Sequence, residues 1–194
     1  MPPIVLASSS PYRKALLARL NLPFTTCSPE VDEAARPGET PTQQCERLSR
    51  SKAQAISCQQ PEAIVIGSDQ IATIDGAVLG KPGNHARAVQ QLSQCNGRQV
   101  DFFTGLCVQQ GFQQHFHLAH TQVQFRQLTP AEIHRYVTIE VPFDCAGSFK
   151  AEGLGICLFD AISSRDPSDL IGLPLIALSQ LLRQFGVNPL LEAG

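Results

Sequence analysis

The stretch Ala63-Ile64-Val65-Ile66-Gly67-Ser68-Asp69-Gln70 decides the fold of this chain. Its first four residues form a continuous apolar run, which is typical of a strand buried on both faces in an α/β protein. The next residues are typical of turns, so we expect the strand to stop there and to resume at residues 71–74, before an Asp75-Gly76 turn. The stretch thus predicts a buried strand ending at a carboxylate, where ligands of α/β proteins usually bind.

Strands and helices alternate on both sides of this stretch. Helix starts are marked by Ser10 and Thr40, each followed by proline, and by the capping box that opens at Thr129. Further strands are predicted at residues 4–7, 24–27, 99–108 and 116–125, and helices at 11–20, 41–57, 84–94, 129–138 and 174–185. No repeat or linker interrupts the pattern, which predicts one α/β domain over residues 1–194 with a mixed sheet.

Composition excludes several classes of protein. The 194 residues and 21.0 kDa suit one domain with a sizeable core. The 15 basic and 17 acidic residues give a net charge of -2, which argues against a protein that coats nucleic acid or an anionic membrane. No run approaches the roughly 20 apolar residues of a membrane helix, and no signal peptide is visible, so we expect a cytoplasmic protein. The 7 cysteines lack a CxxC pair, and we expect reduced, mostly buried thiols.

The start of the first predicted helix is one candidate binding site. Arg13 and Lys14 fall in its first turn, where the positive end of the helix dipole disfavours cations. Two cations, free backbone N–H groups and the hydroxyls of residues 8–10, including Ser8, would together bind phosphate or another polyanion. The alternative is a solvated helix end that carries two unfavourable charges.

Three other segments carry candidate site residues. Asp69 suits metal binding or base chemistry, although glycine, serine and aspartate are equally expected in a turn that ends a strand. Gly80-Lys81-Pro82 has neither the spacing nor the hydroxyl of a Walker A motif, but it holds Lys81 where it could meet an anion. Asp32 and Glu33 could help to hold a divalent cation, or they form part of a solvated acidic loop.

Taken in order, a series of short motifs resembles the Maf family of nucleoside triphosphate pyrophosphatases over nearly the whole chain. The motifs are Leu6-Ala7-Ser8-Ser9-Ser10-Pro11-Tyr12-Arg13-Lys14, Pro29-Glu30-Val31-Asp32-Glu33, Lys52-Ala53, Gly67-Ser68-Asp69-Gln70, Gly80-Lys81-Pro82, Phe103-Thr104-Gly105, Ala146-Gly147-Ser148-Phe149-Lys150 and Gly172-Leu173-Pro174. Each motif is unremarkable alone. Their order and spacing make chance similarity very unlikely.

Within the family, three features resemble the branch that hydrolyses 7-methyl-GTP more than the branch that acts on dTTP and UTP. These features are the Tyr12 position, Gln70 and the segment 145–155. Tyr12 stands where the first branch often has tryptophan, which retains an aromatic face. Lys14 stands where the family commonly has a second arginine, which keeps the charge but loses the bidentate fork.

The resemblance implies a Maf/ITPase-like fold, with a mixed twisted sheet, flanking helices and two lobes around a central cleft. It also implies a divalent metal, Mg²⁺ or Mn²⁺, and hydrolysis between the α and β phosphates. By this resemblance Asp69 accepts the proton of the attacking water, and Glu33 and Asp69 bind the metal. Residues expected to hold the triphosphate are Ser8, Arg13, Lys14, Lys52 and Lys81. Residues expected to read the base are Tyr12, Gln70 and Glu152.

The resemblance also bounds the partners and the alternatives. A small nucleotide is the expected substrate, with no stable nucleic-acid partner and no membrane, and a homodimer is an open option. The alternatives are a dTTP/UTP pyrophosphatase of the same family and a non-catalytic nucleotide-binding regulator of septum formation. The acidic and cationic candidates argue against a pure binder, which would need no base.

Overall fold

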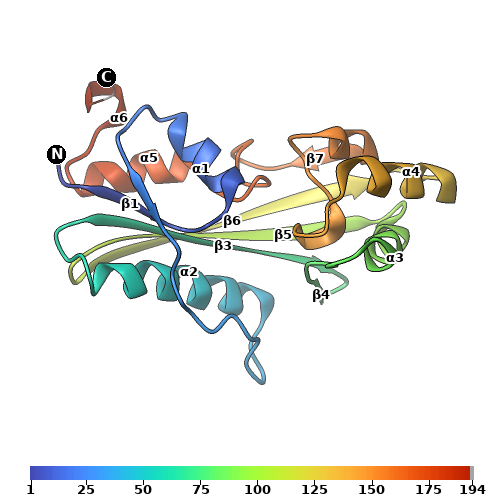
Figure 1. The fold of residues 1–194 in the computed structure, drawn as a ribbon, viewed down its shortest axis with the longest axis horizontal. Helices are drawn as coiled ribbons and strands as arrows, with labels where there is room; N and C mark the ends of the chain where they lie inside the picture. Colours follow the sequence, from blue (N-terminus) through green and yellow to red (C-terminus); the bar gives the residue numbers. More distant parts are fainter. Residues whose placement is uncertain (193–194) are drawn as a thin grey trace. The chain divides into compact units, whose positions relative to one another are not determined.

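A computed structural model describes residues 1–192 of the chain, and Figure 1 shows the arrangement of its elements. In chain order these are β1 (Ile4–Ala7), α1 (Pro11–Ala18), β2 (Thr25–Cys27), α2 (Pro41–Ser57), β3 (Ile64–Ile74), β4 (Ala77–Leu79), α3 (His85–Cys95), β5 (Gln99–Gln110), β6 (Gln113–Phe125), α4 (Pro130–Glu140), the 3-10 helices η1 (Ala146–Ser148) and η2 (Leu154–Leu158), β7 (Phe159–Ser163), α5 (Leu175–Gln184) and α6 (Pro189–Glu192). Among the described residues, no helix has both the length and the apolar character needed to cross a membrane.

The strands form one mixed sheet in the order β2-β1-β3-β5-β6-β7, with β4 paired to β3. β1 runs parallel to both β2 and β3, whereas β3 with β4 and β6 with β7 are antiparallel pairs. The predicted α/β class with a mixed sheet is therefore confirmed. Helices flank the sheet, and three of their predicted caps are present: the side chains of Ser10, Thr40 and Thr129 each accept the N–H of the residue three positions on.

The predicted stop of the central strand at residues 67–70 is wrong, because β3 continues unbroken from Ile64 to Ile74. Groups from other elements support the extended backbone here. The N–H of Asp69 donates to Ser49 Oγ at 3.0 Å, and Ser68 Oγ donates to the carbonyl of Gly172 at 2.9 Å. Asp69 consequently lies inside a strand, where its position is better defined than in a turn.

Several short elements were not predicted from the sequence. β4 and β7 lack the apolar alternation of a strand, and β7 is exposed along most of its length. β5 and β6 are longer than expected because only Gly111 and Phe112 separate them, with Gly111 at φ +54°. The helix α6 was also not anticipated.

The cysteines agree only partly with the prediction. All seven are free thiols, as expected for reduced cysteines. Three are buried (Cys45, Cys95, Cys107), two are half-buried (Cys27, Cys145) and two are exposed (Cys58, Cys157). The expectation that most of them are buried is therefore wrong. Cys58 is the C-cap residue of α2, and Cys157 lies on the short 3-10 helix η2. Within residues 1–192, no other element packs over either thiol closely enough to bury it.

By packing, the chain forms two compact units. Unit 1 contains residues 1–69, 104–119 and the chain from Asp166 onward. In unit 1, α2 covers one face of the sheet and α1 with α5 covers the other (Figure 1). The core on the α1 and α5 side includes Leu6, Ile66 and Leu178, and the core on the α2 side includes Ala53 and Val65, all buried. These two apolar layers enclose the first residues of β3.

Unit 2 contains residues 70–103 and 120–165. Its core includes four phenylalanine rings that meet edge to face, with centroids 4.9–5.8 Å apart: Phe102, Phe125, Phe149 and Phe159. Gly147, at φ +75°, makes the turn that brings Phe149 into this cluster. The aromatic cluster anchors the segment that precedes Glu152.

Candidate active site

Three side chains on one face of α2 contact three different groups of Asp69. Lys52 Nζ donates to Asp69 Oδ1 at 2.7 Å, Ser49 Oγ accepts the Asp69 N–H at 3.0 Å, and Cys45 Sγ donates to the Asp69 carbonyl oxygen at 3.4 Å. Residues 45, 49 and 52 follow the i, i+4, i+7 spacing of one helix face. The helix thus holds the carboxylate and the backbone of the same residue.

Two glycines let α2 approach the sheet this closely. A Cβ on Gly67 would lie only 2.6 Å from the backbone nitrogen of Ala53, and it would also collide with the Ser49 carbonyl oxygen. A Cβ on Gly105 would lie 3.1 Å from the Cys45 carbonyl oxygen and would overlap Ser49 Oγ. Glycine is required at both positions for close packing rather than for a turn.

Lys52 pairs with two carboxylates at once. Its Nζ lies 2.6 Å from Glu33 Oε1 and 2.7 Å from Asp69 Oδ1. Lys52 and Asp69 are 7% and 8% exposed, so both charges are largely withdrawn from water, whereas Glu33 is exposed. Burying a charge is costly unless it is paired, and the single ammonium group satisfies both carboxylates. The structure therefore brings three of the predicted site residues together in unit 1.

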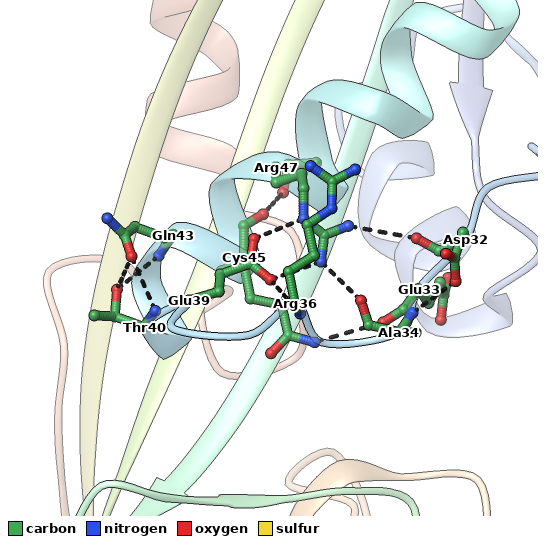
Figure 2. A network of polar contacts seen from close by, with 11 residues as sticks. Asp32, Glu33, Ala34, Arg36, Glu39, Thr40, Gln43, Cys45 and Arg47 are labelled. Carbon is green, nitrogen blue, oxygen red and sulfur yellow. Dashed lines mark hydrogen bonds and ion pairs between the residues drawn. The ribbon is translucent and has the colours of Figure 1, made fainter.

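Arg47 orders the acidic loop that carries Glu33 (Figure 2). This arginine was not among the site residues predicted from the sequence. Its guanidinium donates to both carboxylate oxygens of Glu39, at 2.6 and 2.8 Å, and to the carbonyl oxygens of Ala34 and Asp32, at 3.0 and 3.4 Å. Such a bidentate pair is strong and directional. The loop before α2 is therefore an ordered support for Glu33 and not simply a solvated acidic segment.

The Arg47–Glu39 ion pair changes the pKa of the Glu39 carboxyl group. Hydrogen bonding from Arg47 lowers the pKa of Glu39 from its usual 4.5 to about 2, with a further contribution from the Arg36 N–H. That N–H donates to Glu39 Oε2 at 3.1 Å. The pair stays charged over the whole range of pH in which most proteins are active.

The start of α1 combines two other predicted residues with a carbonyl group from a distant part of the chain. Ser8 Oγ, buried at the end of β1, accepts the N–H of Ser10 at 3.1 Å. Arg13 Nε donates to the carbonyl oxygen of Gly172 at 2.9 Å, and Ser68 Oγ donates to the same oxygen. The Gly172-Leu173-Pro174 motif thus supplies the acceptor that orients Arg13. Lys14 is exposed on the same helix.

Arg13 lies in the electrostatic field of the Asp69 cluster. Burial lowers the pKa of Arg13 from its usual 12.5, while the carboxylates of Asp69 and Glu33 act in the opposite direction. The arginine remains charged because its ordinary pKa is so high. Its placement at the first turn of α1 is unfavourable for the helix dipole, and the nearby carboxylates offset that cost.

The remaining predicted residues belong to unit 2, apart from the half-buried Tyr12 on α1. Gln70 follows Asp69 in β3 and is half-buried, Lys81 is exposed after β4, and Glu152 is exposed between η1 and η2. The structure describes these three within their own unit. Whether they meet the Asp69 cluster around one nucleotide stays a prediction.

The segment that carries Glu152 is held by α4. Tyr136 Oη accepts the N–H of Lys150 at 3.0 Å, and Lys150 Nζ donates to the carbonyl oxygen of Glu140 at 2.7 Å. Glu140 Oε1 also accepts the N–H of Leu154 at 2.9 Å. Burial raises the pKa of Tyr136, which remains a neutral phenol at any ordinary pH. The chain on either side of Glu152 is therefore fixed.

The donor chemistry of the Asp69 cluster fits a hard divalent cation. The carboxylates of Glu33 and Asp69 already share one cation, the Lys52 ammonium. No group of three or more His, Cys, Asp or Glu side chains that could hold a metal occurs within residues 1–192. Mg²⁺ is commonly bound by one or two carboxylates together with substrate phosphates, and two carboxylates match that mode.

Comparison with known sequences identifies a family. The family model described as "Maf-like protein" matches residues 3–185. The chain is 52% identical over 190 residues to a protein of Albidiferax ferrireducens named 7-methyl-GTP pyrophosphatase, with 96% of this chain and 95% of that protein covered. A protein of the same name from Xanthomonas axonopodis pv. citri is 54% identical over 186 residues, with 96% and 98% covered. A third, from Bordetella pertussis, is 50% identical over 189 residues, with 97% and 95% covered.

A solved structure supports the architecture independently. The structure of the Staphylococcus aureus Ham1 protein matches with a TM-score of 0.53 and covers 94% of this chain and 98% of that one. The sequence identity is 13%, so the match concerns the fold alone. The mixed sheet with flanking helices is thus shared with a protein of very different sequence.

Proposed function

Because the chain belongs to the Maf family, we propose that it is a nucleotide pyrophosphatase that hydrolyses the α-β phosphate bond of 7-methyl-GTP to 7-methyl-GMP and pyrophosphate. The names of relatives about half identical over nearly the whole chain support both the activity and the substrate. The structural observation that carries the proposal is that α2 contacts the carboxylate, the N–H and the carbonyl group of the buried Asp69. A side chain fixed in this way is suited to take part in a reaction. Removing a modified nucleotide from the cellular pool would be the physiological role.

Asp69 is the proposed proton acceptor for the attacking water. A positioned carboxylate can remove a proton as the water oxygen approaches the α phosphorus. The ammonium of Lys52 holds Oδ1 at 2.7 Å and so orients the carboxylate. Holding the base in one orientation lowers the entropic part of the activation barrier, because the carboxylate loses little further freedom of motion in the transition state.

The cations of the site would bind the triphosphate. Positive charge around the phosphate oxygens is the main requirement of phosphoryl transfer. Arg13 is oriented through Nε by the Gly172 carbonyl, so its planar terminal nitrogens suit a phosphate oxygen pair. Lys52 lies beside the base, and Ser8, Lys14 and Lys81 would complete the set.

Glu33 and Asp69 are the proposed ligands of Mg²⁺ or Mn²⁺. When bound, such an ion neutralises phosphate charge and polarises the phosphoryl group for attack. Lys52 now occupies the position between these two carboxylates, and it would turn toward the phosphates when substrate and metal arrive. The acidic loop fixed by Arg47 would keep Glu33 in place during that exchange.

Tyr12, Gln70 and Glu152 are the proposed readers of the base. The 7-methylated guanine ring is positively charged, so its stacking on an aromatic face gains about 0.5 to 2 kcal/mol from the cation–π interaction. A carboxylate such as that of Glu152 can accept hydrogen bonds from N1 and N2 of guanine. The hydrogen bonds from α4 that fix the segment around Glu152 favour this role.

The organisation of the protein in the cell is part of the same proposal. We expect the chain to act as one domain of residues 1–194 on a free nucleotide in the cytoplasm, without a membrane or a stable nucleic-acid partner. Gel filtration with light scattering would distinguish a monomer from the homodimer that remains an option.

A panel of substrates tests the proposed function. Pyrophosphate release from 7-methyl-GTP, GTP, dTTP and UTP is measured with Mg²⁺ or Mn²⁺, and kcat/KM is compared. We expect the highest value for 7-methyl-GTP. A clear preference for dTTP or UTP would move the chain to the other branch of the family, and tight nucleotide binding without pyrophosphate release would indicate a regulator.

A further inference from the structure

We propose that Ser49 is a positioning residue for Asp69, acting through the backbone of the proton acceptor; the inference rests on the catalytic role proposed for Asp69. Ser49 is completely buried, and its hydroxyl makes two hydrogen bonds. Oγ accepts the Asp69 N–H at 3.0 Å and donates its own proton to the Cys45 carbonyl at 2.8 Å. The single proton of the hydroxyl is committed to Cys45, so the lone pair facing Asp69 has a defined direction.

The strand pairing of β3 explains why the Asp69 N–H takes its hydrogen-bond acceptor from a side chain. The pairing of β3 with β1 ends at Gly67, and the pairing of β3 with β4 begins at Ala72. Asp69 lies between these two points, outside the paired residues of β1 and of β4. A buried N–H without a partner is costly, and Ser49 takes the place of the missing strand. The Cys45 thiol does the same for the carbonyl group.

The surroundings restrict the hydroxyl to this arrangement. Gly67 and Gly105 offer no Cβ, and α2 fills that space with Ser49, whose oxygen atoms would collide with a side chain at either position. On the same helix, the Cys45 thiol donates to the Asp69 carbonyl oxygen at 3.4 Å, so both backbone groups of Asp69 are bound to α2. A close-packed site of this kind transmits small shifts of the helix to the strand.

The test compares two serines of the same helix. Ser57 is buried, at 2% exposure, but its Oγ has no hydrogen-bond partner among the described residues, so Ser57→Ala is a matched control. We expect Ser49→Ala to lower kcat for 7-methyl-GTP about tenfold with KM within about twofold, because the base is displaced while the phosphate contacts remain. Ser57→Ala should change neither constant.

A double variant separates positioning from a general loss of structure. If Ser49 acts through Asp69, adding Ser49→Ala to Asp69→Asn causes no further loss of kcat. A multiplicative further loss, or an equal effect of Ser57→Ala, would overturn the proposal. Should Ser49→Ala not fold, the near-isosteric Ser49→Cys gives the same comparison, since a thiol is a weaker acceptor than a hydroxyl.

Hydrogen exchange of the Asp69 amide provides a readout that does not depend on the substrate. In the wild-type protein this amide should be protected, and in Ser49→Ala it should exchange at least about tenfold faster than in Ser57→Ala. Unchanged protection in Ser49→Ala would refute the inference even if the protein hydrolyses 7-methyl-GTP. Lost protection in a protein that proves inactive on every nucleotide would instead refute the proposed function alone.

Discussion

The ammonium nitrogen of Lys52 lies 2.7 Å from Oδ1 of Asp69, and both side chains are almost completely buried. The same nitrogen contacts Glu33 at 2.6 Å. One lysine is therefore shared by the two carboxylates that we propose as metal ligands, and the metal and Lys52 must compete for them.

This competition predicts that Lys52→Gln binds Mn²⁺ more tightly in the absence of nucleotide, by about tenfold, because the carboxylates lose their internal counter-ion. Titration followed by electron paramagnetic resonance measures the affinity without any turnover. Pyrophosphate release should nevertheless be slower, since a phosphate ligand is lost. Lys14→Gln, which removes an exposed cation of α1, should leave the Mn²⁺ affinity unchanged. Equal or weaker binding by Lys52→Gln would refute the shared position.

Asp69→Asn should reduce kcat about 10² to 10⁴-fold, the usual contribution of a positioned general base. The amide is nearly isosteric with the carboxylate and leaves the backbone contacts to Ser49 and Cys45 in place. Stopped assays of pyrophosphate release measure the loss, and circular dichroism checks the fold. Asp75→Asn, in the exposed turn after β3, serves as the control and should retain full activity. Near wild-type turnover by Asp69→Asn would exclude it as the base.

The Arg47–Glu39 pair should make the thermal stability of the protein depend on pH in the acidic range. The pKa of Glu39 is lowered from 4.5 to about 2 in the folded protein, so its contribution is fully present above about pH 4.5 and is lost as the pH falls toward 2. Thermal unfolding of wild type and Glu39→Gln, followed from pH 6 to pH 2.5, should show a Tm difference that shrinks over this window. The exposed Arg50–Glu46 pair provides the control, Glu46→Gln, for which we expect little difference at any pH. A Tm difference that is constant with pH would argue against the ion pair.

Gly67→Ala should destabilise the protein by about 1–3 kcal/mol, because the new methyl group meets backbone atoms of α2 that cannot rotate away. Gly105→Ala should cost less, since the Ser49 hydroxyl is one of the groups it meets and can turn, at the expense of its bond to Asp69. Urea denaturation gives the free energies of unfolding. Gly80→Ala faces open space and should be neutral to within about 0.5 kcal/mol. If all three variants were equally stable, the close contact of α2 with the sheet would be wrong.

Glu140→Ala should weaken recognition of the base without slowing the chemistry. It removes the acceptor of the Leu154 N–H, a hydrogen bond worth about 1 kcal/mol, so KM for 7-methyl-GTP should rise about fivefold with kcat unchanged. Glu140→Gln keeps an acceptor oxygen and should behave like the wild type. A fall in kcat with KM constant would instead connect this segment with the reaction itself.

Much of the fold could be predicted from local signals. Ser10, Thr40 and Thr129 mark helix starts by chemistry confined to a few residues, and each cap is present in the structure. The apolar run that opens β3 is similarly self-contained. By contrast, Gly67 was interpreted as part of a turn, since its real role depends on a helix that packs against it from elsewhere in the chain. β7 was missed because its pairing with β6, rather than its own pattern, makes it a strand.

The candidate site shows the same division. Asp69, Lys52 and Glu33 were recognised because their motifs occur in a characteristic order, and the structure places them in contact. Ser49 and Arg47 were not recognised as site residues. A serine or an arginine on a polar helix gives no indication of a role in the site until its hydrogen-bond partners are known. The spacing of residues 45, 49 and 52 was the one available hint, as it puts them on a single face of α2.

The uneven exposure of the cysteines makes the molecule suited to site-selective labelling. Burial holds the pKa of Cys45 at about 12, so a maleimide at neutral pH meets almost no thiolate beside Asp69. Cys58 and Cys157 are exposed, and they lie in unit 1 and unit 2 respectively. A pair of spin labels on these two native thiols would report the separation of the units, and any change in it when nucleotide binds, without a single substitution near the site.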